Sequence, residues 1–492
     1  MEFYMKKLIR NALILQDAAT PAKRLDMIVE NDKISAIGPH LELTSNNIEQ
    51  IEDGSNSLII PGLVNAHLHS HDRFDKGRFG TIPLEIWISL YNPPTISRQW
   101  TPRECYLRTM ISGIELLRSG TTMVIDDVHH GMPFNNDNIE AVFQAYKDLG
   151  IRAQVSVSHS DKPFWEGIPY LNQLLPDSLK KRQDQYQAPT SNEVLDYWEK
   201  MALKWNGIVQ FVLSPSGPQR CSEMFLQDTW SLSEKHKLPV VIHVLETQIQ
   251  QMSGDFFYQK SLVEYMNDLE LLTPRTNLIH GVWMTNQDLD LIAANNSCIV
   301  HCPASNLKLA SGIAPLEEMI KRDITVGLGT DNHNANDSAN ILETMKLAGL
   351  LPTINNQDYQ NLPCAKDILH MATAGGANCA SLGDSIGSLE VGKQADYVVF
   401  DLNHSSFSPL NDVANQIVYS EQGEAIKEVV VAGKPVFKDG SATQIDETKI
   451  FEELRESVTV IQQKIANTIP TGQALEPYLK EAYLKCMEQI SK

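Results

Sequence analysis

The chain has 492 residues, of which 42% are hydrophobic, 21% charged and 7% aromatic. This length suits one large domain with an appendage or two to three domains, and the composition does not fit disordered or fibrous proteins. No apolar run approaches the roughly 18 residues of a membrane span. The net charge of −20 disfavours nucleic acid and anionic membrane surfaces as partners. We therefore expect a soluble globular protein.

Two features bear on the cellular compartment. Residues 1–17 are interrupted by Arg10, Asn11 and Asp17 before an apolar run of secretory length develops, so they do not resemble a signal peptide. Seven cysteines are scattered along the chain without a CxxC pair, which favours reduced thiols over a disulfide framework. Both features predict a cytoplasmic location.

The predicted elements begin with short alternating strands in residues 1–56, namely LIRNALIL, DMIVEN and KISAIG. Eight nearly continuous apolar runs follow, at 57–64, 121–127, 151–158, 208–214, 239–245, 276–281, 297–302 and 324–330. A helical pattern follows each run, and the clearest one opens with a capping box at 101–104 and closes at Gly120. Eight such units predict a parallel (β/α)₈ barrel over residues 57–390, although an open doubly wound sheet can also be built from them.

A long connection interrupts this alternation at residues 159–200. It contains Phe164, Trp165 and Tyr170. Loops of this length in a barrel are more often lids or pocket walls than spacers. We therefore predict that the segment covers the pocket and that Trp165 contacts the substrate.

The C-terminal part of the chain returns to turn-rich β character in residues 391–437, with the strands ADYVVFD and IKEVVVAGKPVF. Its similarity to the N-terminal strands suggests one small β domain made of residues 1–56 and 391–440. Residues 441–492 are a polar helical tail of moderate amphipathicity, to which the sequence assigns no role.

Potential metal ligands stand where the predicted strands end. His67 and His69 follow the first run at i, i+2 spacing, which places both imidazoles on one face of an extended segment. His243 lies near the end of the fifth run and Asp331 just after the eighth. The C-terminal ends of barrel strands converge, so these four side chains predict a site for one divalent ion. Three histidines and one aspartate suit Zn²⁺, with Fe²⁺ and Mn²⁺ as alternatives.

Two further side chains are predicted to move protons. Glu246 follows His243 by three residues, close enough to reach a water that the metal activates; otherwise it is a solvated carboxylate at a helix start. His280, at the end of the sixth run, can polarise the reacting group or accept a proton, or it is a buried structural histidine.

A competing metal site can be drawn from Cys298, His301 and Cys302, because Cys and His clusters bind zinc. A fourth ligand is missing, and strand geometry turns both cysteines away from His301. Without a CxxC pair, the chain also lacks the signature of the zinc deaminases that act on nucleobases in nucleic acids.

Several segments carry a family resemblance: PGLVNAHLH, VIHVLET, LIHGV, HCPASNLKLASG, GLGTD and IGSLEVGKQADYVVFD. Together they resemble the amidohydrolase superfamily, within the branch of guanine deaminase, adenosylhomocysteine/methylthioadenosine deaminases and triazine hydrolases. The resemblance spans residues 5–437. It implies a (β/α)₈ barrel with a small β sandwich built from both chain ends, and commonly a homodimer or higher homo-oligomer. It implies the same ligands and proton-transfer groups as above: His67, His69, His243, Asp331, Glu246 and His280.

The sequence departs from this branch near the metal ligands. After the first pair it runs HDRF, and after Asp331 it runs NHNAND, where related enzymes often carry small residues. In the loop SPSGPQRC, a guanidinium is placed to meet an anionic or carbonyl group. The side chains that either contact substrate or merely line the pocket and its loops are His71, Gln219, Arg220, His333 and, after the second run, His129 and His130.

The leading hypothesis is hydrolytic deamination of an aromatic nitrogen heterocycle such as a purine, pterin or triazine. Water activated by the metal would attack the amino-bearing carbon, and Glu246 would pass its proton to the ring nitrogen. Release of an alkylamine or chloride, or cleavage of an amide or urea bond, are alternatives within the same chemistry. A non-catalytic binding protein on an inherited barrel is the alternative from another class.

Overall fold

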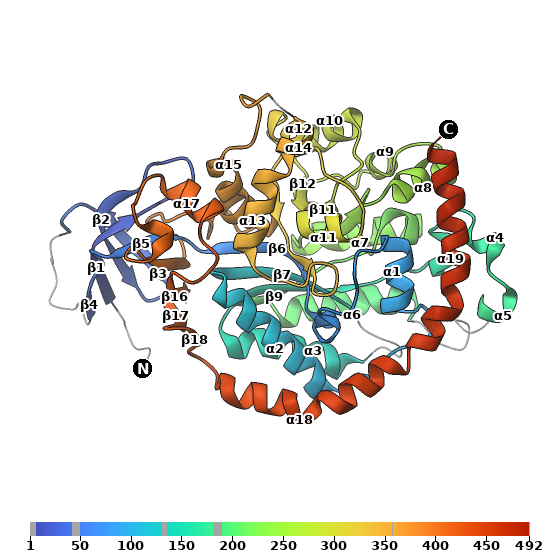
Figure 1. Cartoon of the computed structure of the whole chain (residues 1–492), viewed down its shortest axis with the longest axis horizontal. Helices are drawn as coiled ribbons and strands as arrows, with labels where there is room; N and C mark the ends of the chain where they lie inside the picture. The colour runs from blue at the N-terminus through green and yellow to red at the C-terminus, as the bar shows by residue number, and fades with distance from the viewer. Residues whose placement is uncertain (1–5, 42–49, 130–134, 181–188, 357, 492) are drawn as a thin grey trace.

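The computed structural model describes residues 6–41, 50–129, 135–180, 189–356 and 358–491. Figure 1 shows a central barrel surrounded by helices, a layer of strands at one end, and a long helical arm along two sides. The (β/α)₈ barrel predicted from the sequence is confirmed.

The barrel wall consists of short, parallel, fully or largely buried strands. They are β6 (Leu63–His69), β7 (Thr121–His129), β8 (Arg152–Ser158), β9 (Val209–Val212), β10 (Val240–Val244), β11 (Thr276–His280), β12 (Cys298–His301), β13 (Val326–Leu328) and β14 (Asp331–Asn332). Burial on both faces explains why these segments are nearly continuous in apolar residues.

The strands pair in two ladders, β14-β6-β7-β8-β9 and β10-β11-β12-β13. An isolated parallel bridge between Leu213 and Val240 joins the first ladder to the second. On the other side, one stretch of chain pairs first with β12 as β13 and then with β6 as β14. The eight units thus surround one core, although the ladder hydrogen bonds do not run as one continuous circle.

Helices surround the barrel on its outer side. The longer ones are α2 (Pro102–Arg118), α3 (Asn136–Leu149), α6 (Ser191–Lys204), α7 (Glu223–His236), α8 (Gln248–Tyr258), α9 (Leu262–Asp268), α10 (Asn286–Ala294), α13 (Ile341–Leu350) and α17 (Val413–Tyr419). Shorter helical turns are α4 (Leu171–Leu174), α5 (Asp177–Lys180), α11 (Pro303–Lys308), α12 (Leu316–Lys321), α14 (Pro352–Asn355), α15 (Ala365–His370) and α16 (Gly376–Cys379). The predicted capping box opens α2, where Thr101 and Glu104 exchange both capping hydrogen bonds.

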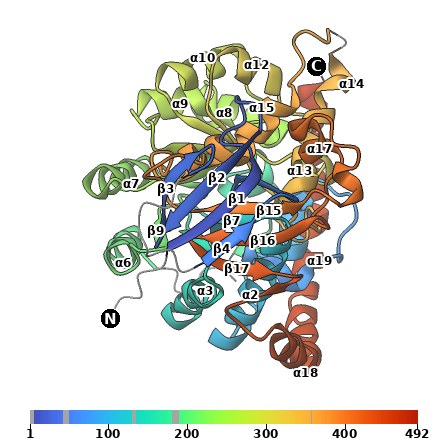
Figure 2. The same ribbon diagram turned by 90° about the vertical axis from the view of Figure 1, so that its left-hand side faces the viewer.

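Strands from both ends of the chain form a second, mixed sheet of nine strands. Their bounds are β1 (Lys6–Ile14), β2 (Lys23–Glu30), β3 (Lys33–Gly38), β4 (Gln50–Asp53), β5 (Ser57–Pro61), β15 (Tyr397–Asp401), β16 (Ile426–Val431), β17 (Lys434–Lys438) and β18 (Ser441–Ala442). The order is β18-β17-β16-β15-β5-β1-β2-β3, with β4 on β1. Figure 2 shows the N-terminal strands beside the C-terminal strands in this layer, and the two groups meet where β5 pairs with β15. The exact limits of a separate β domain stay a prediction.

The first predicted run, 57–64, spans two strands in two different sheets. β5 pairs with β1 and β15 in the mixed sheet, whereas β6 opens the barrel. Gly62 separates them, and a Cβ there would lie 2.0 Å from Oγ1 of Thr122, so only glycine permits this close approach. The apolar run has no periodicity that marks this change of sheet.

The C-terminal residues form an arm of two helices, α18 (Glu447–Ala466) and α19 (Ile469–Ile490), which Figure 1 shows along the bottom and right side of the barrel. α19 contacts α1 (Leu84–Tyr91), α4 and α8. A Cβ on Gly472 would lie 2.7 Å from the backbone oxygen of Ser89, so α19 and α1 pack backbone to backbone. Within the described residues, none of the helices is both long and apolar enough to cross a membrane.

A buried ion pair joins the barrel to the mixed sheet. Nε of Arg152 lies 2.8 Å from a carboxylate oxygen of Asp396, and Nη2 lies 3.1 Å from the other. The same carboxylate accepts a hydrogen bond from the backbone of Ala432, and the backbone oxygen of Asp396 accepts one from Gly62. Asp396 therefore holds β8, β5 and β16 together.

We expect Asp396→Asn to lower the free energy of unfolding by about 3 kcal/mol, because it leaves the Arg152 guanidinium without its counter-ion. Arg103→Gln, which breaks the exposed pair with Glu453, is the control and should cost less than about 1 kcal/mol. Chemical denaturation of both variants checks this. Equal losses would show that the Arg152 pair is not an anchor.

Candidate active site

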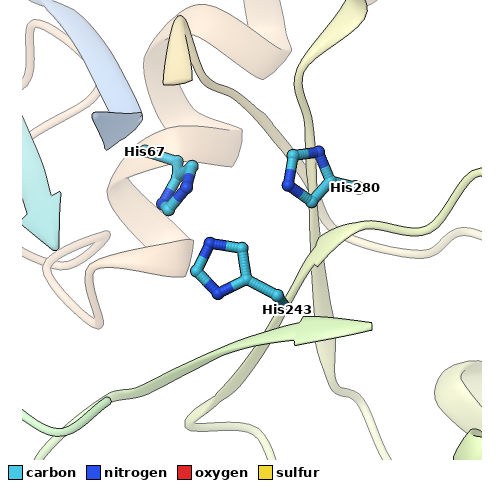
Figure 3. Close-up of side chains that lie close together, drawn as sticks. All are labelled: His67, His243 and His280. Atoms are coloured by element: carbon cyan, nitrogen blue, oxygen red, sulfur yellow. The ribbon is translucent and has the colours of Figure 1, made fainter. Parts of the chain in front are cut away.

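Three imidazoles and a carboxylate meet at the C-terminal ends of the barrel strands. Nε2 of His67 lies 3.4 Å, and Nε2 of His69 3.3 Å, from Oδ1 of Asp331. The His67 ring centroid lies 5.0 Å from that of His243. The structure thus brings together the four side chains predicted as metal ligands. His280 joins them from β11, and Figure 3 shows its imidazole facing the same space as those of His67 and His243.

Backbone close packing permits this convergence. A Cβ on Gly329, between β13 and β14, would lie 2.8 Å from Cβ of His67. Glycine at this position lets the segment that carries Asp331 lie directly against β6. This accounts physically for the glycine that precedes Thr330 and Asp331 in the GLGTD motif.

The second nitrogen of two of these imidazoles is fixed by a backbone oxygen acceptor. Nδ1 of His69 donates to the backbone oxygen of Asp127 at 2.5 Å, and Nδ1 of His243 donates to that of Ser216 at 3.2 Å. Each bond assigns the proton to Nδ1 and leaves the Nε2 lone pair free. Such bonds are typical of metal-binding histidines, because they fix the tautomer and the orientation of the ring.

The donor atoms fit a divalent cation. His67 is fully buried and neither of its ring nitrogens has a hydrogen-bond partner, nor does Oδ1 of Asp331. Ligand atoms of His67, His69 and Asp331 lie within 4.8 Å of one another, as do those of His67, His243 and His280. Buried polar atoms without partners are costly, and a bound cation would satisfy Oδ1 of Asp331 and one ring nitrogen of His67.

The local electrostatics favour neutral imidazoles at His67 and His243 beside an ionised carboxylate. At His69, burial alone would lower the pKa, but Asp331 and Asp127 raise it above its usual value. Burial lowers the pKa of His67 to about 4. Burial and the neighbouring His67 lower the pKa of His243 well below its usual range. Burial alone would raise the pKa of Asp331, but the adjacent His67 and His280 bring it well below its usual range. Neutral imidazoles and a carboxylate are the protonation states that bind metal ions.

Glu246 and His280 face each other beside the ligands. Oε2 of Glu246 lies 3.4 Å from Nε2 of His280, which is 4.0 Å from Oδ2 of Asp331. Nδ1 of His280 donates to Oδ1 of Asn306 at 2.9 Å, so the lone pair of Nε2 faces Glu246. Burial and the nearby Asp331 raise the pKa of Glu246 well above its usual range. A carboxyl group that readily holds a proton is therefore next to a neutral imidazole.

Site residues adopt backbone conformations that side chains rarely take. The φ angle is 75° at His280 and 62° at Asp331, both in the left-handed region that favours glycine. Each such residue costs on the order of 1–3 kcal/mol and persists only where the surrounding structure enforces it. Strain of this kind concentrates at functional sites.

A cavity of about 100 Å³ opens over the ligands. The predicted residues His71, Gln219 and Arg220 line it, as does His129. The helix α1 contributes Tyr91 to its wall, together with Leu84, Trp87 and Ile88. Burial, ahead of the neighbouring His69, lowers the pKa of His71 well below its usual range, and neither of its ring nitrogens has a hydrogen-bond partner.

Two predicted substrate-contact residues lie outside the described lining of this cavity. Trp165 packs with Leu171 and Leu175 against Leu475 and Leu479 of α19. His333 is fully buried. Its backbone N–H donates to Asp72, and Nδ1 lies 3.3 Å from Arg73, so it accepts a hydrogen bond from the guanidinium. His130 lies outside the described residues. The described parts of the predicted lid are residues 159–180 and 189–200.

The structure adds residues that the sequence did not single out. Asp127 at the end of β7 can join a donor group with His69 and His243, and Asn306 fixes the tautomer of His280. The sequence offered only their positions as a signal: Asp127 lies at the end of a predicted strand, and Asn306 lies within the segment HCPASNLKLASG. In the part of the chain that the structure describes, Cys298, His301 and Cys302 do not form a ligand group.

Comparisons with known proteins agree with this geometry. Residues 58–436 match the model of the amidohydrolase family. The 5′-deoxyadenosine deaminase of Methanobrevibacter smithii is 28% identical, over 93% of this chain and 98% of its own length. The 5-methylthioadenosine/S-adenosylhomocysteine deaminase of Caldanaerobacter subterraneus is 30% identical, over 92% and 97%.

Solved structures share the fold. An adenosine deaminase from Xanthomonas campestris with bound zinc superimposes with a TM-score of 0.81 at 24% identity, covering 93% of this chain and 99% of its own. A triazine hydrolase from Arthrobacter aurescens gives 0.83 at 22%, covering 92% and 99%.

We expect purified protein to carry about one divalent ion per chain, which elemental analysis measures. His67→Ala and Asp331→Ala should each reduce occupancy below about a tenth, because even residues that only orient a ligand contribute about 10- to 100-fold in affinity. His71→Asn is the control: this buried histidine is in none of the donor groups, so the variant should keep the ion. Full occupancy in both ligand variants would rule out the site.

Proposed function

The chain belongs to the amidohydrolase family, and from this we propose that it hydrolytically deaminates an aromatic nitrogen heterocycle such as a purine, pterin or triazine. It is a hydrolase of C–N bonds. Relatives that match almost the whole chain are named as deaminases of 5′-deoxyadenosine or of 5-methylthioadenosine and S-adenosylhomocysteine, which favours a purine. The observation that carries the proposal is the face-to-face pair of Glu246 and His280 beside the three ligand imidazoles and Asp331.

We propose that His67, His69, His243 and Asp331 hold one divalent ion per chain, with zinc favoured by the three imidazoles and one carboxylate. When bound, such an ion supplies a Lewis acid that lowers the pKa of water toward neutrality. Asp127 and Ser216 then act through the ligands, because their backbone oxygens fix the Nδ1 protons of His69 and His243.

The proton transfers are assigned to Glu246. Its Oε2 accepts a proton from the attacking water and delivers it to the ring nitrogen next to the carbon under attack. A second transfer carries the proton of the newly added hydroxyl to the exocyclic amine; the C–N bond then breaks, ammonia leaves and the hydroxyl oxygen becomes a carbonyl oxygen. The raised pKa of Glu246 suits a group that must hold a proton between these steps.

His280 polarises the reacting centre in this scheme. Because Nδ1 is bonded to Asn306, Nε2 presents a lone pair toward Glu246 and the pocket. It can accept a hydrogen bond from the attacking water or from the amine. Trp87, Ile88 and Leu309 line the cavity with apolar surface, so these hydrogen bonds act in a medium of lower dielectric constant than bulk water.

Cytoplasmic location and a homodimeric or higher assembly remain proposals that the sequence suggests. The proposed partner is a small-molecule substrate, without nucleic acid or membrane.

The direct test is ammonia release by metal-loaded protein from a panel of aminopurines, aminopterins, aminopyrimidines and aminotriazines. We expect turnover of at least one aminated ring and none of its hydroxyl analogue. Release of alkylamine or chloride without ammonia would instead assign the alternative hydrolysis. Binding without turnover across the panel would favour a non-catalytic protein.

Glu246→Gln should keep the metal and bind substrate but lower kcat by at least about 10², because the amide cannot carry the proton. Glu428→Gln is the matched control: it makes the same change at a buried carboxyl in β16, far from the barrel strand ends. Steady-state kinetics measure kcat, and elemental analysis measures the metal content, of both variants. Normal turnover in Glu246→Gln would move the base to another residue, with His280 next.

A further inference from the structure

A guanidinium without a counter-ion lies at the edge of the catalytic cavity. Arg220 ends η3 (Pro218–Arg220), the turn that follows β9. Among the residues that the structure describes, no carboxylate forms an ion pair with it, and its buried Nε has no hydrogen-bond partner. Burial lowers the pKa of Arg220. In a chain with a net charge of −20, a partly buried cation left unpaired is unusual.

Arg220 lies where two hollows meet. It lines the catalytic cavity and also a side chamber of about 60 Å³. The chamber is bounded by Ile88 of α1, by Ile249 of α8 and by Phe164, Gly167 and Ile168 of the predicted lid. Gln219 lines both hollows as well, and its Oε1 has no hydrogen-bond partner. Unsatisfied polar groups thus border the passage from the reaction centre to the chamber.

Neighbouring groups do not neutralise this cation. The Phe164 ring lies 5.8 Å from the guanidinium carbon, a contact that leaves the N–H donors unused. Glu85 also lines the chamber, but it forms no ion pair with Arg220 and accepts a hydrogen bond from Thr247 at 2.5 Å. Within the described chain, the guanidinium therefore has donors that only a ligand or water can satisfy.

We propose that Arg220 binds an anionic group, most simply a carboxylate, that the substrate carries on an arm extending from the heterocycle. A planar carboxylate matches the guanidinium fork, and the amide of Gln219 can donate a further hydrogen bond to it. This inference rests on the proposed function for the position of the ring. It makes Arg220 a specificity-determining residue that contacts substrate away from the reacting carbon.

Lys162 provides a matched control. It also forms no ion pair among the described residues, and its Nζ donates to the hydroxyl of Tyr258 at 3.2 Å. It lines a neighbouring hollow with Trp165 and Phe256, outside the described lining of the catalytic cavity. Removing its charge changes the local potential without removing the proposed contact.

The test compares adenosine-5′-carboxylate with its neutral 5′-carboxamide. Full-length, metal-loaded Glu246→Gln is titrated calorimetrically with each probe, so affinity is measured without turnover; kcat/KM is measured on the enzyme with Glu246 intact. We expect a preference for the carboxylate of about 10- to 100-fold. Arg220→Gln should bring the ratio of the two affinities near one, and Arg220→Lys should retain part of the preference. Lys162→Gln should leave the preference unchanged. Thermal unfolding confirms that each variant is folded.

The outcomes separate this inference from the proposed function. Equal affinity for the two probes, or a preference that persists in Arg220→Gln, overturns the anion site even if both probes are deaminated. An Arg220-dependent preference without ammonia release supports the anion site and counts against deamination. Adenosine 5′-monophosphate is the third probe. If it binds more tightly than the carboxylate in an Arg220-dependent manner, the anion is a phosphate.

Discussion

The constraint on which the site depends is that buried nitrogen and oxygen atoms must have partners. Four imidazoles and the carboxylate of Asp331 are crowded at one end of the barrel, and His67 in particular has no partner in the protein for either ring nitrogen. Hydrophobic packing alone would not tolerate such a group. The tautomers fixed by Asp127 and Ser216, the close approach at Gly329 and the depressed pKa values of His67, His243 and His280 all become favourable together once a cation is present.

Catalysis and substrate recognition are assigned to different elements of the fold. The strands, which are rigid and buried, carry the metal ligands and the proton-transfer pair, so these groups hold fixed distances. The pocket walls come from α1, α8 and the segment after β8, and α19 contacts these elements from outside. Substrate recognition can therefore differ through the walls and through Arg220 while the reaction centre stays the same.

Much of this could be predicted from the sequence, because the relevant signals are local. Apolar runs ending in His or Asp predict strands and ligands together, and the capping box located the start of α2 within a residue. The division of residues 57–64 between two sheets depends on Gly62 touching Thr122, a contact that strand periodicity does not encode. The same holds for Trp165, whose packing against α19 joins positions about three hundred residues apart. The sequence shows side-chain types but not which of them meet across the fold.

The left-handed backbone at His280 and Asp331 places the stability of the fold in conflict with catalytic activity. Glycine would relax the main chain at either position, so it would be tolerated by the fold while it removed a working side chain. Selection for heat resistance alone would thus be free to erase the reaction centre. Stabilising changes should be sought in the mixed sheet and on the outer helices. A related chain that carries glycine at either of these two positions would be a well-folded protein that has lost the chemistry.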